Sequence, residues 1–143
     1  MVKNTGTSSE DEFELILRRA YGKKVFIYRV TDSKEVRGRS NSKTAFTKAQ
    51  PSDYIVTEDG RMYYAEVKSS NNKTSFPFSQ ISTVQWGSSK RQYIAGGCYF
   101  FFLHNVNTNN WYKVPAFAFH NHDRKSFKWE ELEEFKWKLT TPT

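Results

Sequence analysis

A tight turn at Asp59-Gly60 is the feature of this sequence that most constrains its fold. Both residues tolerate positive φ, and they separate two runs of strand-forming residues, at 52–57 and 61–68, which together predict a β-hairpin. A two-residue turn also fixes the register of the strands, and in that register Asp53 faces Glu66. Residues directly opposite in an antiparallel pair point to the same face, with Cβ atoms about 4.5–5.5 Å apart. The sequence therefore predicts two neighbouring carboxylates on one face of the hairpin.

Lys68 lies two residues beyond Glu66, so the alternation of a strand returns its amine to the face that carries both acids. Carboxylate oxygens at this separation suit Mg²⁺, which takes a few carboxylates and otherwise keeps its water. We expect Asp53 and Glu66 to bind the ion, helped by the main-chain carbonyl of Val67. Lys68 would then orient a water that attacks a phosphodiester, or stabilise the developing negative charge.

An ordinary solvated surface, with Lys68 as the salt-bridge partner of the two acids, is the alternative, since charged residues are mostly exposed. The neighbouring residues argue against it, because apolar side chains alternate onto both faces of the hairpin and predict a sheet that is covered on both sides. Like charges that face each other in such a sheet are destabilising, and a bound cation would offset that cost. The apolar residues are Tyr54, Ile55, Val56, Met62, Tyr63, Tyr64, Ala65 and Val67.

The bulk composition indicates a polyanionic partner. The chain has 143 residues, a size typical of one domain, and a formal charge of 22 − 15 = +7. An anionic membrane is the alternative partner, but neither a basic amphipathic helix nor a lipidation signal supports it. The single cysteine, Cys98, excludes an intramolecular disulfide framework and is typical of a reducing compartment, so we expect a cytoplasmic protein. Cys98 begins the apolar run 98–103 and is expected to be buried.

The remaining pattern alternates helices and strands, which predicts an α/β domain over residues 1–143 with a central mixed sheet flanked by helices. Residues 1–8 are expected to be a flexible tail. Ser9 is expected to cap a helix to about residue 21, and Ser79 a second helix to about residue 92. Further expected elements are strands at 24–30, 98–104 and 111–114, a turn-rich loop at 69–78, helical turns at 115–119 and 129–135, an extended piece at 136–139, and a core containing Trp111, Tyr112, Trp129 and Trp137.

The segment 31–49 is a long polar connection that is rich in basic residues. A loop of this length inside a compact domain is usually functional or disordered. A flexible surface loop without a function is one interpretation, and the other is a basic arm that binds DNA phosphates through Arg37, Arg39 and Lys43 without reading base sequence.

Several segments resemble known nucleases. Pro51-Ser52-Asp53 followed by Glu66-Val67-Lys68 resembles the signature of the PD-(D/E)XK nuclease superfamily. Lys73-Thr74-Ser75-Phe76-Pro77-Phe78, followed by Ile81 and Gln85, resembles a more specific block of RecU-type Holliday-junction resolvases. The residues around Ser9-Glu10-Asp11-Glu12-Phe13 are similar to the opening helix of that group, and 126–132 resembles its C-terminal segment. The resemblance spans roughly residues 6–135.

The resemblance implies a single restriction-endonuclease-like domain, with the basic loop as a stalk between the first two strands. It also implies a Mg²⁺-dependent homodimer, with Mn²⁺ as a substitute, that cuts branched, four-way DNA junctions by paired symmetric nicks without an organic cofactor. Glu10 would complete the metal site, with Glu14 as the substitute candidate, and Gln85 would contact the scissile phosphate or the nucleophile. The expected catalytic residues are Asp53, Glu66, Lys68, Glu10 and Gln85, the expected metal ligands are Asp53, Glu66, Val67 and Glu10, and the expected DNA contacts are Arg37, Arg39, Lys43, Lys73, Thr74, Ser75, Lys90 and Arg91.

Two other functions are compatible with the sequence. One is a sequence-specific endonuclease of the same fold, although the small size of the chain and the lack of an added base-reading module argue against it. The other is a non-catalytic, basic nucleic-acid-binding protein with an inactive nuclease fold. The complete set of Asp53, Glu66 and Lys68 argues against that alternative.

Overall fold

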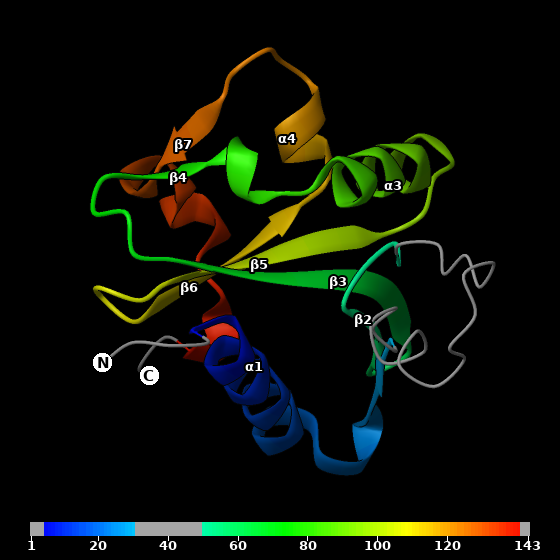
Figure 1. The fold of residues 1–143 in the computed structure, drawn as a ribbon. Helices are drawn as coiled ribbons and strands as arrows, with labels where there is room; N and C mark the ends of the chain where they lie inside the picture. The colour runs from blue at the N-terminus through cyan, green and yellow to red at the C-terminus, as the bar shows by residue number, and fades with distance from the viewer. Residues whose placement is uncertain (1–4, 31–49, 141–143) are drawn as a thin grey trace, which may run out of the picture.

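A computed structural model of the chain describes residues 5–30 and 50–140. Its centre is a five-stranded sheet with strand order β1-β2-β3-β5-β6, in which β3 and β5 are parallel and the other neighbours are antiparallel (Figure 1). The predicted mixed sheet is therefore confirmed. Its strands are β1 (Val25–Arg29), β2 (Tyr54–Glu58), β3 (Arg61–Ser70), β5 (Tyr99–Asn105) and β6 (Asn110–Pro115).

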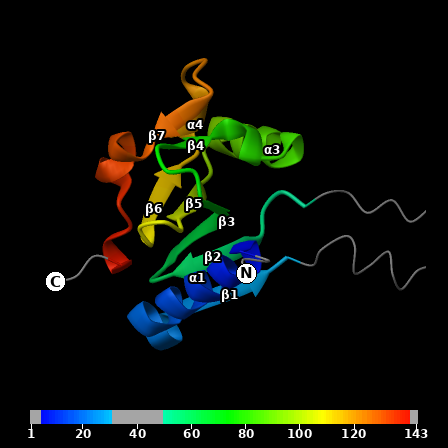
Figure 2. The ribbon, with the colours of Figure 1, turned by 60° about the vertical axis from the view of Figure 1, so that its left-hand side comes forward.

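Helices cover the sheet on both faces. Figure 2 shows α1 (Thr5–Tyr21) on one side and α3 (Thr83–Ile94) with α4 (Phe117–His120) on the other. A small second sheet of β4 (Ser75–Pro77) and β7 (Ser126–Lys128) lies on the side of α3. Short 3₁₀ turns complete the described chain, at Gly22–Lys24, Phe78–Gln80, Trp129–Phe135 and Lys138–Thr140.

The core has one cluster on each face of the sheet. In β5, Phe101 and Leu103 belong to the cluster on the α3 side, whereas Phe102 packs with Phe13 of α1 and with Trp137 on the other side. A central strand with a parallel neighbour is buried on both faces, which is why its sequence is a continuous apolar run. The tryptophans and the tyrosine expected in the core, Trp111, Trp129, Trp137 and Tyr112, are all buried.

The hairpin of β2 and β3 confirms the predicted turn and register. Asp59 and Gly60 have φ of 48° and 87°, the left-handed region that this two-residue turn requires. Glu58 pairs with Arg61, and the register continues to the pair of Tyr54 and Ala65. The strand bounds differ slightly from the expected ones, because β2 begins at Tyr54 and β3 continues to Ser70.

The prediction that Ser9 caps the first helix is wrong. The helix begins at Thr5, so part of the expected tail is helical, and Ser9 lies inside it and is buried. The hydroxyl of Ser9 forms a hydrogen bond of 2.7 Å with Nδ1 of His104 on β5. A capping serine uses its oxygen for a backbone N–H of its own helix, and here that oxygen joins the helix to the sheet instead.

The second helix also begins later than predicted. Ser82, not Ser79, is its cap, and the Ser82 side chain accepts a hydrogen bond from the backbone N–H of Gln85. Phe78 and Ile81 are buried on either side of the exposed Ser79, and their burial keeps residues 78–80 in a 3₁₀ turn against the core.

The structure corrects three further expectations. The expected loop 69–78 contains β4, which pairs with β7 from a distant part of the chain. The expected extended piece 136–139 is extended only at its start, where the backbone N–H of Trp137 donates to the carbonyl of Trp111 at 2.9 Å, and it ends in a 3₁₀ turn that the bond from the N–H of Thr140 to the carbonyl of Trp137 closes. Cys98 is exposed rather than buried, since β5 begins one residue after it. The expected basic arm 31–49 lies outside the described residues. Among the residues that the structure describes, no helix is long and apolar enough to cross a membrane.

Replacement of Ser9 tests the bond between helix and sheet. Ser9→Ala should lower the free energy of unfolding by roughly 1–3 kcal/mol, because it leaves a buried nitrogen of His104 without its partner. Ser8→Ala is the matched control, since Ser8 is exposed on the same helix and should show no loss. Urea denaturation measures both variants, and equal stability of the two would contradict the assigned role.

Candidate active site

The end of the hairpin opposite the turn brings Asp53 and Glu66 together, as the register predicts. The backbone N–H of Asp53 donates to Oε1 of Glu66 at 3.0 Å, and the backbone N–H of Val67 donates to Oδ2 of Asp53 at 2.9 Å. Each carboxylate is thus held by the backbone of the other strand. The N–H and C=O of one residue in a strand point to the same edge, so the carbonyl of Val67 also faces Asp53.

The carboxylate of Glu66 is buried, which disfavours its charged form. Its residue is only 3% exposed, and Nζ of Lys68 lies 3.4 Å from Oε2. Burial, and then the charge of Asp53, raises the pKa of Glu66 from 4.5 to about 8, while Lys68 acts in the opposite direction. A site with this electrostatic balance favours a bound proton or a bound cation.

Helix α1 presents Glu10 to the same region. Burial raises the pKa of Glu10, the charge of Asp53 raises it further, and the guanidinium of Arg29 lowers it. Arg29, at the end of β1, contacts the Glu10 carboxylate directly. Glu14, the other helix candidate, instead accepts a hydrogen bond of 2.7 Å from the hydroxyl of Tyr54. The structure therefore brings Glu10 rather than Glu14 under the influence of Asp53.

The site offers two close carboxylates rather than three. Within residues 5–30 and 50–140 no group of three or more His, Cys, Asp or Glu side chains is placed to hold a metal ion, so Glu10 does not complete such a group. Asp53 and Glu66 nevertheless bring two carboxylates together, and Mg²⁺ is commonly held by one or two carboxylates with several waters. The raised pKa of Glu66 shows that its negative charge is poorly compensated, so the donor set fits a divalent cation.

Two side chains from other elements fix the segment that leads into Asp53. Nε2 of Gln85, near the start of α3, donates to the carbonyl of Gln50 at 3.3 Å. The hydroxyl of Tyr99 on β5 donates to the carbonyl of Pro51. Gln85 thus lies beside the chain that carries the acidic site, and its described bond is to backbone rather than to Asp53 or Glu66.

The expected DNA-contacting residues are spread over the surface. Lys73, Thr74 and Ser75 follow β3, where Oδ1 of Asn72 accepts the backbone N–H groups of Thr74 and Ser75 at 3.0 Å each. These bonds give the turn a defined shape next to the acidic strand. Lys90 and Arg91 are exposed on α3, and Arg37, Arg39 and Lys43 lie outside the described residues.

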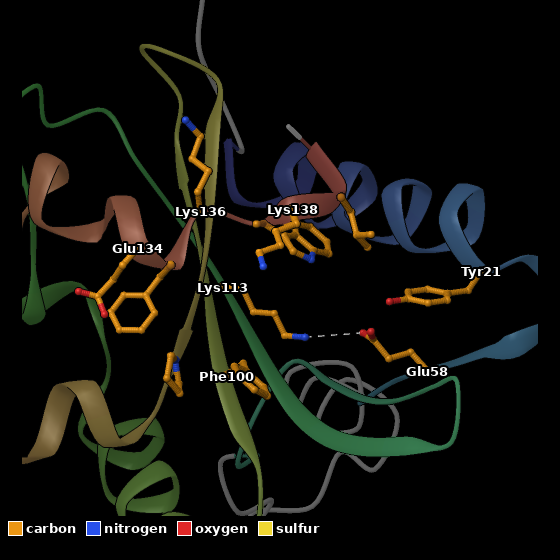
Figure 3. Close-up of a pocket in the computed structure, with 11 residues that line it drawn as sticks. Tyr21, Glu58, Phe100, Lys113, Glu134, Lys136 and Lys138 are labelled. Carbon is orange, nitrogen blue, oxygen red and sulfur yellow. Dashed lines mark ion pairs between the residues drawn. The ribbon is translucent and has the colours of Figure 1, made fainter. Parts of the chain in front are cut away.

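A different polar cluster lies at the turn end of the hairpin, and nothing in the sequence pattern predicted it. Figure 3 shows Lys113 of β6 directed at Glu58 of β2 across a cavity of about 370 Å³, with Nζ and Oε1 4.0 Å apart. Tyr63 donates its hydroxyl to Glu58, and Lys113 lies 4.6 Å from the ring centre of Phe100. Burial lowers the pKa of Lys113. This cluster is at the opposite end of β2 from Asp53.

Arg29 and Tyr99 were not found by sequence reasoning. Arg29 ends a strand that is remote in sequence from Glu10, and Tyr99 lies within an apolar run. Neither carries a local signal, because their partners are set by packing between elements. Only the hairpin contacts of Asp53, Glu66 and Lys68 follow from local rules.

Comparison with known proteins identifies the family. The chain is similar in structure to "Archaeoglobus fulgidus Hjc, a Holliday junction resolvase from an archaeal hyperthermophile", with a TM-score of 0.57 and 15% sequence identity over 94% of this chain and 91% of that one. At this identity the likeness shows the fold, and it confirms the expected nuclease fold. No curated protein matches the chain significantly. The sequence model of the family described as Recombination protein U (RecU) matches residues 20–142, and the chain therefore belongs to the RecU family.

Proposed function

We propose that this protein is a Mg²⁺-dependent, structure-selective endonuclease that resolves four-way DNA junctions. The observation that carries the proposal is the buried Glu66 beside Asp53 and Lys68 in a chain of the RecU family. The structurally similar Hjc is itself described as a Holliday junction resolvase. A net charge of +7 supports a polyanionic substrate.

The side chains of the acidic site have separate tasks in this proposal. Asp53 and Glu66 hold the cation, with the carbonyl of Val67 as a further ligand. A bound Mg²⁺ supplies charge neutralisation at the phosphate and a lower pKa of a coordinated water. Lys68 places a positive charge next to Glu66, where it stabilises the negative charge that develops during hydrolysis. Glu10 takes a supporting position, oriented by its contact with Arg29.

The proposed substrate requires two cuts. Symmetric incision of two opposed strands needs two active sites, and a two-fold homodimer supplies them. Gln85, Lys73, Thr74 and Ser75 are proposed to contact the DNA backbone near the cut, because they flank the segments that carry Asp53 and Lys68. Lys90 and Arg91 on α3, together with Arg37, Arg39 and Lys43, are proposed to contribute further phosphate contacts.

Cleavage of a synthetic four-way junction tests the proposal. The wild type with Mg²⁺ should release nicked duplexes, and Asp53→Asn should still bind the junction but cut it more than about 100-fold more slowly, since even outer-shell partners of metal ligands contribute 10–100-fold. Asp59→Asn is the matched control, because it makes the same chemical change at the exposed turn of the same hairpin. It should cut at the wild-type rate.

Two other results would favour the competing functions. Equal cleavage of linear duplex and junction would contradict junction selectivity and favour a nuclease of the same fold with another substrate. Binding of DNA without cleavage by the wild type, in both Mg²⁺ and Mn²⁺, would favour the non-catalytic alternative. Mapping of the cut positions on both strands would show whether the nicks are symmetric.

The raised pKa of Glu66 predicts how stability depends on pH when no divalent cation is present. The folded protein keeps a proton on Glu66 up to about pH 8, whereas the unfolded chain releases it near pH 4.5. The folded state therefore binds more protons between these values, and the free energy of unfolding should fall as pH rises from about 4.5 to about 8. Glu66→Gln should flatten this fall, and thermal unfolding in the presence of a chelator measures it.

Added Mg²⁺ should restore stability to the wild type at pH 8 and leave Glu66→Gln unchanged, because the cation binds the folded site only. Glu130→Gln is the control, since Glu130 is exposed on a 3₁₀ turn and should behave as the wild type does. The same pH slope in wild type and Glu66→Gln would show that Glu66 does not carry the effect.

A further inference from the structure

A second cavity, of about 520 Å³, lies next to the start of α3. Three apolar side chains form its walls, two hydroxyls and two cations complete it, and no acidic residue lines it. The lining residues are Phe78, Ser79, Ile81, Thr83, Trp86, Arg124 and Lys125. They come from the segment between β4 and α3, from α3 itself and from the loop between α4 and β7, which lie together on one side of the central sheet (Figures 1 and 2).

The cavity and the acidic site share a wall. Nε2 of Gln80 donates to the carbonyl of Ser69, the residue after Lys68, at 3.0 Å. Five residues later, Gln85 is bonded to the carbonyl of Gln50, three residues before Asp53. The segment between these anchors includes Ile81 and Thr83, which line the cavity. One short stretch of chain therefore contacts the two segments that carry the acidic site and also forms part of the cavity.

The aromatic wall is built from rings that pack against one another. The rings of Phe78 and Trp86 have centroids 5.5 Å apart, Phe78 packs 5.1 Å from Phe119, and Trp86 lies 4.4 Å from His120. All four tryptophans of the chain are among the described residues, and Trp86 is the one that is not fully buried. A partly exposed aromatic ring such as that of Trp86 is the type of side chain on which nucleobases stack.

The polar rim favours an anion. Lys125 is exposed, and Arg124 lies 5.3 Å from the ring of Phe127 and contacts Glu131, so its guanidinium is oriented. The cavity at the other end of the sheet differs in its lining, because it includes the acidic residues Glu58 and Glu134 beside the cation Lys113. Cations beside aromatic rings match a nucleotide, which has an apolar base and a charged phosphate.

We infer that this cavity takes one unstacked nucleotide of the DNA strand next to the phosphate that is cut. The inference rests on the proposed function and extends it to how the substrate is selected. Trp86 would stack on the base, with the buried ring of Phe78 supporting it from the core, and Arg124 with Lys125 would bind the adjoining phosphate. The free-energy cost of displacing a base is lowest where pairing and stacking are already interrupted. A base pocket beside the cutting site therefore favours branched DNA over a continuous duplex.

Photo-cross-linking identifies the occupant directly. A four-way junction that carries a single 5-iodouracil beside the cut position is irradiated with the wild-type protein in a chelator, and the cross-linked peptide is identified by mass spectrometry. The expected product joins the base to Trp86, the aromatic residue of the lining that is not buried. Cross-links found only elsewhere, or none from any position near the cut, would overturn the inference. This readout needs no cleavage, so a cross-link to Trp86 in a protein that cuts no junction would refute the proposed function and leave the pocket standing.

Two variants test the role of the pocket in selection. Ser79→Leu fills the cavity from an exposed position without removing a core contact, and it should lower junction cleavage roughly tenfold or more, the loss expected for one stacked base. Thr108→Leu makes a similar addition on an exposed turn elsewhere and should have no effect. Lys125→Ala, compared with Lys138→Ala as the control of equal charge, should weaken junction binding severalfold. Wild-type cleavage by Ser79→Leu together with wild-type binding by Lys125→Ala would overturn the inference.

Discussion

The register of the β2–β3 hairpin is the constraint on which the acidic site depends. The turn at Asp59 and Gly60 determines which residues of the two strands face each other, and five pairs later it places Asp53 opposite Glu66. A slip of one residue would move every side chain of one strand to the other face of the sheet. Because both faces are covered by apolar clusters, such a slip would also bury polar groups in the core, so packing and site geometry enforce the same register.

The hairpin carries two buried acids, and their surroundings differ. Glu58, near the turn, has a tyrosine hydroxyl and the ammonium of Lys113 as partners. Glu66 has a backbone N–H and Lys68, but it also has the charge of Asp53 beside it, and the resulting pKa of about 8 shows that these partners are insufficient. The first acid has a cationic and a hydroxyl partner, whereas the second also lies beside a carboxylate whose repulsion the proposed cation would offset. The proposed metal site is therefore at the Asp53 end of the hairpin and not at the turn.

Local sequence rules predicted the parts of the fold that local physics controls. The turn, its register, the facing of Asp53 and Glu66, and the buried strand β5 follow from φ preferences and residue alternation. Predictions from local patterns were wrong where a residue has a partner that is distant in sequence. Ser9 carries a capping pattern but bonds to His104, 95 residues away, and β4 exists only because it pairs with β7. The contact of Arg29 with Glu10 could not be predicted for the same reason, since it requires the packing of β1 against α1 to be known.

In the segment from Gln80 to Gln85, a local sequence pattern and contacts with distant residues act together. Its sequence predicted a helix from Ser79, but the burial of Phe78 and Ile81 delays the helix to Thr83 and leaves a short stretch of chain bonded to Ser69 at one end and to Gln50 at the other. Both bonds are made by glutamine side chains, and the later start of the helix lets Gln80 reach Ser69 from the 3₁₀ turn while Gln85 reaches Gln50 from the first turn of α3. The delayed start therefore gives the protein a wall that touches the segments bearing the acidic residues on one side and opens on an aromatic, basic cavity on the other. In the proposed complex, this shared wall would place the nucleotide in the cavity next to the phosphate at Asp53 and Glu66, because the same stretch of chain contacts both sites.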